Sequence, residues 1–334
     1  MLKQLFILTL LGNALLAHAA DIETMNAQQV AIQIADQPEE ALLLSADEDL
    51  SGTVLALASA PKQPQPEQTR DEAFKSSVLK LTSSPRLRSA IGLIYDEREQ
   101  RPLYSKSADV VAPIASITKL MTAMVVLDAQ LPMDEAISIS ADDADKHKRT
   151  RSRMRPGITA TRAELLKLAL MASENRAAAA LARTYPGGTA AALAQMNAKA
   201  RELGMNSTRF RDATGLSSGN VSTAHDLVKM VRAAQGYELI HKYSTSTSHT
   251  LQLAGQRPMQ FRNTNPLVRN ASWDIGISKT GYISEAGKCL VMEAKISDHP
   301  VIIVLLDSWG RHTRVGDANR VKQWVEKGAR RAQF

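Results

Sequence analysis

The distribution of hydrophobic residues predicts strands at both ends of a domain and helices between them. Residues 90–95 are almost continuously apolar, and residues 102–105 follow after a polar turn, a pattern typical of two hairpin strands. Apolar residues then recur at helical spacing in four segments, at 116–127, 161–183, 189–203 and 223–234. The C-terminal part predicts strands again, at 249–253, 275–282, 289–295 and 301–306, and a last amphipathic helix at 315–330.

This order of elements predicts an α/β protein of the α+β kind, with an antiparallel sheet flanked by helices and joined to an all-helical lobe. The N-terminal hairpin can pair with the C-terminal strands in one sheet, and the first and last helices can pack on it. Thr161 with Glu164, and Thr223 with Asp226, are typical capping pairs at two helix starts. We expect a ligand site in the cleft between sheet and lobe.

Residues 1–20 have the composition of a signal peptide. Lys3 gives the positive start, Leu5–Leu16 is an apolar run too short to span a bilayer, and Ala17-His-Ala19 has the small-x-small cleavage pattern. An uncleaved anchor is the alternative interpretation. No later stretch approaches ~20 apolar residues, so no transmembrane anchor is expected in the rest of the chain.

The chain contains one cysteine, Cys289, which cannot form an internal disulfide and lies in a predicted buried strand. Exported proteins of the eukaryotic secretory path commonly depend on disulfides, whereas the bacterial periplasm also holds proteins without them. The sequence therefore predicts a periplasmic protein in which Cys289 is a buried, unreactive residue.

Residues 21–85 are predicted to form an extension or linker before a catalytic domain of residues 86–334. Residues 61–68 are rich in Pro and Gln, and residues 26–58 contain apolar clusters without a sustained period. Residues 21–61 carry eight acidic residues and no Lys or Arg. The sequence leaves open whether this segment docks on the domain.

The net charge of +7 is unevenly distributed along the chain. From residue 62 onward there are 40 basic and 26 acidic residues, which gives a net charge of +14. An exported basic domain is expected to bind an anionic polymer, which in the periplasm is the cell wall, and this predicts peripheral wall association. A generally basic surface without a partner is the alternative.

Other classes of ligand find little support in the composition. Only 4% of the residues are aromatic, so stacking platforms for nucleic acid are not expected. The seven histidines show no H-E-x-x-H motif and no i,i+4 pair. We therefore expect no nucleic-acid partner, no metal and no other cofactor.

Three short motifs follow one another along the chain. Ser116-Ile-Thr-Lys119 has the form S-x-x-K, Ser173-Glu-Asn175 the form S-x-N, and Lys279-Thr-Gly281 the form K-T-G. The first two are weak singly, because about one S-x-x-K is expected by chance at this length. Chance matches are indeed present, as Ser77-Val-Leu-Lys80 and Ser218-Gly-Asn220.

The order of the motifs and their predicted elements carry the inference. Ser116 opens a predicted helix, Ser173 falls at a helix end in the helical lobe, and Lys279 lies on a late strand. Each motif alone is equally well explained as a surface lysine, a helix end or a strand end. All three in this order match the pattern of penicillin-binding proteins and class A β-lactamases.

The spacing of the first two motifs suits nucleophilic catalysis. Ser116 and Lys119 lie three residues apart at a helix start and therefore on one face. A serine hydroxyl needs a base, and Lys119 can be that base if burial or a neighbouring cation such as Lys279 lowers its pKa. Ser173 can relay a proton to the leaving amine, and Asn175 can hold substrate or Lys119.

The third motif suits substrate binding. Lys279 and Thr280 can bind a substrate carboxylate, and the small Gly281 lets the substrate lie against the strand edge. The main-chain N–H of Ser116 lies at a helix N-terminus, where the dipole favours a developing oxyanion. The N–H of Tyr282, just after Gly281, is the second expected oxyanion donor.

The chain from about 88 to 334 resembles the low-molecular-mass penicillin-binding proteins, the serine D-alanyl-D-alanine peptidases. The resemblance is carried by Ala112–Thr122 around the nucleophile, by Leu203–Phe210, Thr214–Leu216 and Ser222–Asp226, and by Asn263–Arg269, Ser278–Tyr282 and Glu285–Cys289. The last group looks most like the type-7 D,D-endopeptidase branch. The resemblance implies a transpeptidase fold of the penicillin-binding-protein and β-lactamase kind, a peptidoglycan substrate, a Ser116 acyl-enzyme and stable acylation by β-lactams.

Within this family the resemblance favours an endopeptidase that hydrolyses D-Ala–diaminopimelate crosslinks. Carboxypeptidases of the family usually carry a second β-rich domain and an amphipathic C-terminal helix, whereas here 53 residues follow Gly281. A D-Ala-D-Ala carboxypeptidase remains an alternative. A class A-like β-lactamase needs a carboxylate to activate the deacylating water, and its nearest candidate, Glu202, is predicted at a surface helix end. A non-catalytic wall-binding protein would keep the fold without acylation.

Overall fold

The computed structural model describes residues 79–332, except 146, 147, 149, 254 and 256. The predicted signal peptide and all of the predicted extension up to residue 78 lie outside the described residues. Among the helices of the described part, none is long and apolar enough to cross a membrane.

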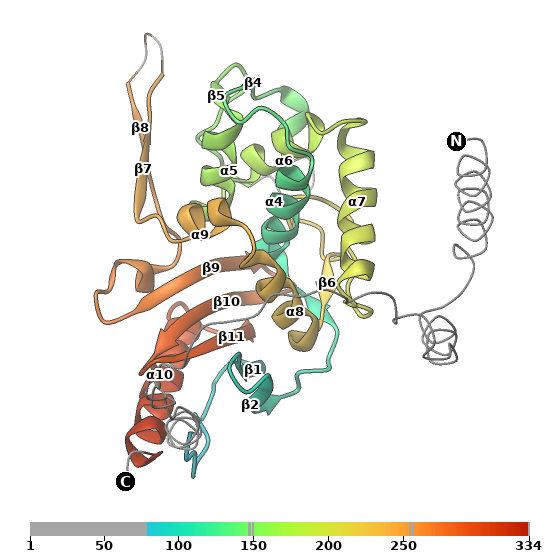
Figure 1. The fold of residues 1–334 in the computed structure, drawn as a ribbon. Coiled ribbons are helices and arrows are strands. Elements are labelled where there is room, and N and C mark those ends of the chain that lie inside the picture. Colours follow the sequence, from blue (N-terminus) through green and yellow to red (C-terminus); the bar gives the residue numbers. More distant parts are fainter. Residues whose placement is uncertain (1–78, 146–147, 149, 254, 256, 333–334) are drawn as a thin grey trace, which may run out of the picture. The chain divides into compact units, whose positions relative to one another are not determined.

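A five-stranded antiparallel sheet forms the centre of the described domain (Figure 1). Its strands, in spatial order, are β2 (Arg101–Lys106), β1 (Ile91–Asp96), β11 (His299–Ser308), β10 (Gly287–Ile296) and β9 (Asp274–Ile283). The N-terminal hairpin pairs with the C-terminal strands, as predicted, with Ile94 opposite Ile303. Strand β9 lies at the edge of the sheet and carries the K-T-G motif.

Strand β11 is apolar along most of its length because helices cover both faces of the sheet. Successive side chains of a strand point to opposite faces. Ile302 and Val304 belong to the core shared with the helical lobe, whereas Ile303 and Leu305 belong to the core shared with α10 (Thr313–Ala332). A strand buried on both faces shows no polar alternation, which explains the continuous apolar run in the sequence.

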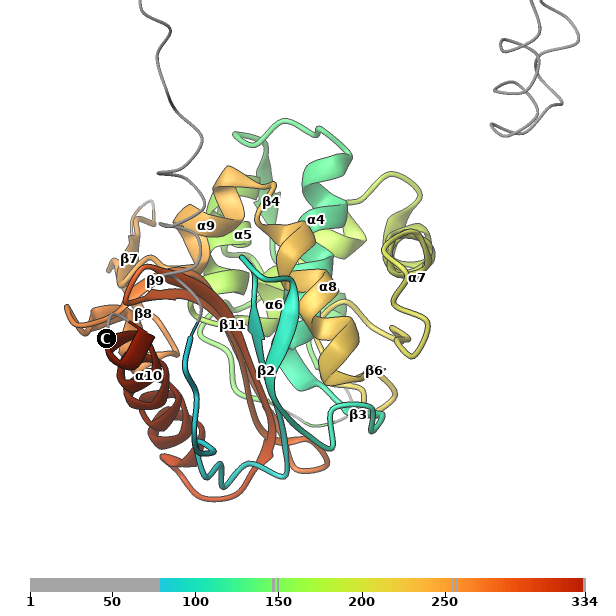
Figure 2. The ribbon, with the colours of Figure 1, turned by 60° about the horizontal axis from the view of Figure 1, so that its bottom comes forward.

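The helices that cover the sheet differ from the prediction in one respect. Helix α10 covers one face, as predicted, while α8 (Ala224–Ala234) and α9 (Glu238–Ser244) pack on the other (Figure 2). The first helix, α4 (Lys119–Asp128), makes its main contacts with α5, α6, α7 and α8 rather than with the sheet. Its residues 119–126 are all buried, and a helix that is buried all round belongs inside a helical layer.

The helical lobe is built from α4, α5 (Arg162–Met171), α6 (Asn175–Arg183) and α7 (Gly188–Glu202). The single helix predicted over 161–183 is therefore two helices. Ser173, between them, has a φ of 58°, a left-handed conformation that cannot continue a right-handed helix. Thr161 and Glu164 form the predicted capping box at the start of α5, and the Thr223 side chain accepts a hydrogen bond from the Asp226 N–H.

Several short elements connect these parts, and of these the sequence pattern predicts only the helical character of residues 116–118, which form a 3₁₀ helix rather than the first turn of an α-helix. The short elements are β3 (Ala112–Pro113), η2 (Ala115–Thr118), β4 (Ala136–Ser138), η3 (Ala141–Asp143), β5 (Thr159–Thr161), β6 (Val221–Ser222), β8 (Met259–Arg262) and η4 (Pro266–Arg269). The predicted strand at 249–253 is β7 (Ser248–Leu251), which pairs with β8. The 3₁₀ helix η2 is the most important of these elements, because it places Ser116 against β9.

The packed domain begins before residue 86, the boundary expected from the sequence. Leu79 and Leu87 are buried in the same core as α10. The Lys80 N–H donates to the Gly328 carbonyl at 3.3 Å, and the Trp324 indole donates to the Ser83 carbonyl at 2.5 Å. The last residues of the predicted extension therefore belong to the domain.

Candidate active site

Ser116 and Lys119 form a direct contact at the start of the buried helix. Ser116 lies in η2 and Lys119 begins α4, so the three-residue spacing places both side chains on one side of the chain. The Lys119 Nζ donates a hydrogen bond to the Ser116 Oγ at 2.8 Å. Lys119 is 1% exposed, whereas Ser116 keeps 8% exposure. The arrangement gives the serine a base within hydrogen-bond reach and some access from outside.

The surroundings of Lys119 hold its amine in place. Its Nζ also donates to the Asn175 Oδ1 at 2.8 Å and to the Thr214 carbonyl at 2.5 Å. Burial lowers the pKa of Lys119 to about 7, although the carboxylates of Asp212 and Glu174 act to raise it. A lysine with this pKa is partly neutral near pH 7 and can accept the proton of Ser116.

Of the two causes expected from the sequence, burial and a neighbouring cation, burial lowers the pKa of Lys119. Lys279 is not among the groups that lower the pKa of Lys119, and burial is the leading cause. The pKa of Lys279 is itself well below its usual value, first through burial and then through the nearby charges of Lys119 and Arg314. A bound substrate carboxylate beside Lys279 would favour its charged form.

Ser173 and Lys279 form a second contact across the two parts of the domain. The Lys279 Nζ, on strand β9, donates to the Ser173 Oγ at 2.8 Å and to the Thr280 carbonyl at 2.8 Å. Ser173 is held in its left-handed conformation between α5 and α6. Backbone conformations of this kind cost energy and cluster at functional sites. The structure thus brings the S-x-N and K-T-G motifs into contact.

The K-T-G strand lies directly against the nucleophile segment. A Cβ atom added to Gly281 would lie 2.9 Å from the Ile114 carbonyl oxygen and 3.0 Å from the Ser116 nitrogen. Only glycine therefore permits this approach of β9 to η2. The Thr280 Oγ1 lies 2.6 Å from the Thr264 Oγ1, which orients the threonine.

Tyr282 follows Gly281 on the edge strand, where its side chain is 59% exposed. The ring faces the Lys288 ammonium at 4.7 Å from its centroid. Arg314, which the sequence analysis missed, donates to the Gly281 carbonyl at 2.9 Å and to the Cys289 carbonyl at 3.2 Å. Arg314 therefore connects β9 to β10 next to Gly281, where β9 borders the site.

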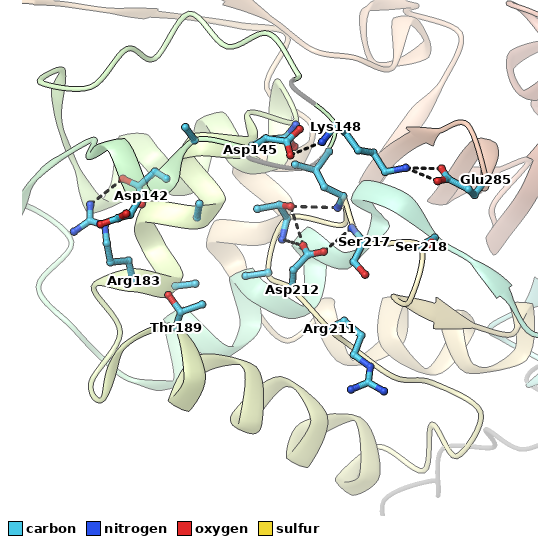
Figure 3. A pocket seen from close by; sticks show the side chains of 18 residues that line it. Asp142, Asp145, Lys148, Arg183, Thr189, Arg211, Asp212, Ser217, Ser218 and Glu285 are labelled. Atoms are coloured by element: carbon cyan, nitrogen blue, oxygen red, sulfur yellow. Dashed lines mark hydrogen bonds and ion pairs between the residues drawn. The ribbon is translucent and has the colours of Figure 1, made fainter.

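A loop that the sequence analysis assigned no chemistry completes the site. The Asp212 Oδ1 accepts hydrogen bonds from the main-chain N–H groups of Thr214 and Gly215, each at 2.6 Å, and its Oδ2 accepts one from Ser217 at 2.6 Å (Figure 3). Gly215 has a φ of 82°, and a Cβ added there would lie 2.1 Å from the Ala115 carbonyl oxygen. This loop holds the Thr214 carbonyl on Lys119. A main-chain acceptor leaves no residue-type signal, although Thr214-Gly-Leu216 belongs to the segments that carry the resemblance.

The S-x-N match at Ser218-Gly-Asn220 is structural. The Asn220 Oδ1 accepts from the Arg211 N–H at 2.7 Å, and its Nδ2 donates to the Thr118 Oγ1 at 2.9 Å. Asn220 is fully buried, so it anchors the loop to η2 rather than facing a substrate. The other chance match begins at Ser77, which lies outside the described residues.

A cavity of about 650 Å³ adjoins the site next to Asn175 and Thr214 (Figure 3). Lys148 reaches Glu285 in the β9–β10 turn, with its Nζ 2.5 Å and 2.6 Å from the two carboxylate oxygens. This hydrogen bond from Lys148 lowers the pKa of Glu285 to about 2. The cavity therefore extends the site between the helical lobe and the sheet, where a ligand site is expected from the order of elements.

Two residues that the sequence analysis weighed as alternatives lie away from catalysis. Cys289 is fully buried on β10, and burial raises the pKa of its thiol to about 11, so it is a poor nucleophile, as predicted. Glu202 is exposed at the end of α7, as expected for a surface residue. No group of three potential metal ligands occurs within the part of the chain that is described.

Comparison with known proteins agrees with this geometry. Residues 79–310 match the Peptidase S11 family, described as D-alanyl-D-alanine carboxypeptidase. The chain is 47% identical over 245 residues to a D-alanyl-D-alanine endopeptidase of Pseudomonas aeruginosa, covering 72% of this chain and 78% of the relative. It is 45% identical over 255 residues to the D-alanyl-D-alanine endopeptidase of Escherichia coli K12, covering 76% and 82% of the two chains.

Solved structures show the same fold. The Streptomyces K15 DD-transpeptidase matches with a TM-score of 0.68 and 28% identity, over 73% of this chain and 98% of the other. Penicillin-binding protein D2 of Listeria monocytogenes in its cefotaxime-bound form matches with a TM-score of 0.64 and 26% identity, over 73% and 99%. The fold is thus of the penicillin-binding-protein kind, and the chain belongs to the S11 family of serine D-alanyl-D-alanine peptidases.

Proposed function

We propose that the protein is a serine D,D-endopeptidase that hydrolyses D-Ala–diaminopimelate crosslinks of peptidoglycan through an acyl-enzyme on Ser116. The observation that carries this proposal is the convergence of Ser116, Lys119 and Asn175 with Ser173 and Lys279 at one edge of the sheet. The similarity to two relatives named as endopeptidases supports the choice of reaction. The predicted signal peptide and the wall substrate together favour the periplasm as its location.

In the first half of the reaction, neutral Lys119 takes the proton of Ser116 while the Oγ attacks the D-Ala carbonyl carbon. The carbonyl oxygen becomes an oxyanion, for which the N–H groups of Ser116 and Tyr282 are the proposed donors. As the intermediate collapses, the C–N bond breaks and the leaving amine takes a proton that Ser173 relays from Lys119. The products are the free amine and an ester between D-Ala and Ser116.

In the second half, water hydrolyses the ester. Lys119 is neutral again and takes a proton from the water, whose oxygen attacks the ester carbonyl carbon. The ester C–O bond breaks, the Ser116 Oγ regains its proton, and D-Ala leaves with a free carboxylate. A β-lactam opens on Ser116 in the same way, but its amine stays tethered to the acyl group, which gives a stable adduct.

Lys279 and Thr280 are proposed to bind a carboxylate on the leaving side of the bond. The Lys279 Nζ already contacts the Ser173 Oγ, the group proposed to protonate the leaving amine. A carboxylate near this amine would restore the positive charge of Lys279. Leaving groups with a nearby carboxylate, either a terminal D-Ala or a stem peptide, therefore suit the site.

The test of this proposal is digestion of a purified crosslinked muropeptide dimer, followed by mass analysis. We expect conversion of the dimer to monomers faster than release of D-Ala from a monomeric pentapeptide. Faster release of D-Ala would make the protein a carboxypeptidase, a function favoured by the description of its family and by more distant relatives such as that of Bacillus subtilis, 29% identical over 238 residues.

A labelled penicillin tests the nucleophile in the same preparations. Ser116→Ala is expected to abolish labelling, and Ser77→Ala, in the other S-x-x-K match, is the matched control that keeps it. Labelling that survives Ser116→Ala would assign the acyl-enzyme to another serine. Rapid turnover of the penicillin instead of a stable adduct would favour a β-lactamase, and failure of the wild type to label would favour a non-catalytic wall-binding protein.

A further inference from the structure

A second cavity, of about 590 Å³, is lined by four arginines. Arg151 and Arg153 come from the loop of residues 150–158, Arg176 from the first turn of α6, and Arg262 from the end of β8. Glu174 is the acidic residue in the lining, and it accepts a hydrogen bond from Ser152. The cavity, which we call the arginine groove, therefore carries a net positive charge.

Two of these arginines build the wall of the groove. The Arg153 guanidinium lies 4.0 Å above the centroid of the Phe261 ring and donates to the Gln260 carbonyl at 2.6 Å. Arg176 donates to the Met154 carbonyl at 3.0 Å. These contacts connect the loop, α6 and β8, so the groove has a defined shape.

The other two arginines are available to a ligand. Arg151 and Arg262 are exposed, and within the described ranges neither guanidinium forms a salt bridge or a side-chain hydrogen bond. An unpaired guanidinium presents several N–H donors in a planar arrangement that matches a carboxylate. The groove thus offers two unused anion-binding groups supported by two fixed ones.

The groove borders the proposed leaving side of the catalytic site. Its lining residues Ala172 and Glu174 flank Ser173 directly in the chain. Thr150, also in the lining, accepts a hydrogen bond from the Asn175 Nδ2 at 3.2 Å. Arg262, the last residue of β8, lies two residues before Thr264, whose hydroxyl contacts that of Thr280. In Figure 1 the β7–β8 hairpin extends beyond β9 alongside α5.

We propose that the arginine groove binds carboxylates of the leaving stem peptide and so selects crosslinked substrates. This inference rests on the proposed function. A terminal D-Ala has one carboxylate, which Lys279 and Thr280 are proposed to hold. A leaving stem peptide brings further carboxylates, and the groove is a positively charged site of matching chemistry on the same side of the bond.

The test compares wild type with the double variant Arg151→Gln, Arg262→Gln on a dimer with free carboxylates on the leaving stem. We expect KM for this dimer to rise about fivefold, as for two exposed ion pairs, with kcat little changed. The matched control is Arg201→Gln, an exposed arginine on α7 away from both cavities, which should keep the wild-type KM. Labelling by penicillin, which has no leaving stem, checks that each variant is folded.

A second substrate separates binding of carboxylates from a structural effect. The comparison dimer keeps the carboxylate next to the scissile amide and has the other carboxylates of its leaving stem amidated. Its KM with wild type should be higher than that of the unmodified dimer, whereas the double variant should have the same KM for both dimers. A merely structural role of the arginines would raise KM for both dimers in parallel and overturn the inference. Equal KM values of wild type for the two dimers would also overturn it, while leaving the endopeptidase activity itself intact. Absence of dimer cleavage by wild type would instead contradict the proposed function.

Discussion

The contacts of Lys119 and Lys279 place two lysine side chains in one buried site. Each amine contacts one of the two serines, and burial lowers the pKa of both. The unbound site therefore disfavours two positive charges. A substrate carboxylate next to Lys279 would stabilise one charge there and leave Lys119 free to act as the base.

The pKa of Lys119 predicts the pH dependence of acylation. Because the neutral amine is the base, we expect the rate of penicillin acylation to increase as pH rises through about 7, where half of Lys119 has lost its proton. Lys119→Ala should lower the rate by about 100-fold or more. Stopped-flow measurement with a fluorescent penicillin between pH 5 and pH 9 provides the check.

Lys279→Arg is the matched comparison for this prediction. Arginine keeps a positive charge but changes the shape of the donor group, so a smaller loss of rate with the same pH midpoint is expected. Equal losses from Lys119→Ala and Lys279→Arg, or a rate independent of pH in the wild type, would contradict the general-base role of Lys119.

Sequence motifs identify site residues that act through their side chains. Of the main-chain groups, they indicate only those within or next to a motif, such as the N–H groups of Ser116 and Tyr282. Lys119 and Ser173 could be predicted because lysine and serine at those spacings have a chemical meaning. Thr214 contributes a carbonyl oxygen, which every residue type carries. Asp212 acts by fixing that loop, and only the structure brings its carboxylate to the N–H groups of Thr214, Gly215 and Ser217.

At the scale of elements, strands buried on both faces could be predicted most closely. The pattern at 301–306 lies within β11, and that at 289–295 lies within β10. The sequence predicts a helix end at Ser173 but not the left-handed turn that separates α5 from α6, because the residues around Ser173 have helical character and tertiary contacts impose the turn. Strand β8 was missed because it is only four residues long, Met259–Arg262, and so gives a weak signal even though its apolar and polar residues alternate.

Strand β10 carries an acidic residue whose ionisation opposes folding. Burial, followed by the nearby Glu97 and Asp274, raises the pKa of Glu293 to about 7. The native state therefore binds more protons than the unfolded state between pH 4.5 and about 7, and the stability falls as pH rises through this range. Above pH 7, Glu293 is ionised in both states, and the free energy of unfolding stays lowered by the full cost of burying its charge.

Glu293→Gln is expected to stabilise the protein at pH 8 by about 2 kcal/mol, since it removes that cost. At pH 4.5 the variant and the wild type should have similar free energies of unfolding. Urea denaturation at both pH values measures the difference. The exposed Glu202→Gln on α7 is the control, with a change within about 0.5 kcal/mol at either pH. A stabilisation that is equal at pH 4.5 and pH 8 would show that ionisation of Glu293 is not its cause.

At the scale of the molecule, the site lies where two differently built parts meet. The helical lobe supplies Lys119 and Asn175, and the edge of the sheet supplies Lys279 and Gly281. The order of strands and helices along the chain predicts this division, because the hairpin and the C-terminal strands must pair around the helices between them. The sequence predicts a ligand site between these parts, but not the shape or lining of the two cavities, which depend on loop conformations.

The basic charge of the chain after residue 61 predicts that salt slows the reaction with intact cell wall more than the reaction with a small molecule such as penicillin. Attraction to an anionic wall acts over several ångströms and is screened by salt, with a Debye length of about 8 Å at 0.15 M. Raising the salt from 0.05 to 0.5 M should therefore slow the release of muropeptides from intact sacculi several-fold. Penicillin acylation, measured in the same buffers, should change by much less. Equal salt effects on both would argue against an electrostatic association with the wall.

The burial of Cys289 provides a direct measure of how often the sheet opens. It is the one cysteine in the chain, its thiol is fully enclosed on β10, and its raised pKa keeps it protonated at neutral pH. A thiol reagent can then react only during a transient separation of β10 from its neighbours, so the alkylation rate reports the opening equilibrium. A ligand that bridges Ser116 and the adjacent edge strand β9 should slow this alkylation. The rate at Cys289 would then report inhibitor binding from a buried position that the inhibitor does not contact.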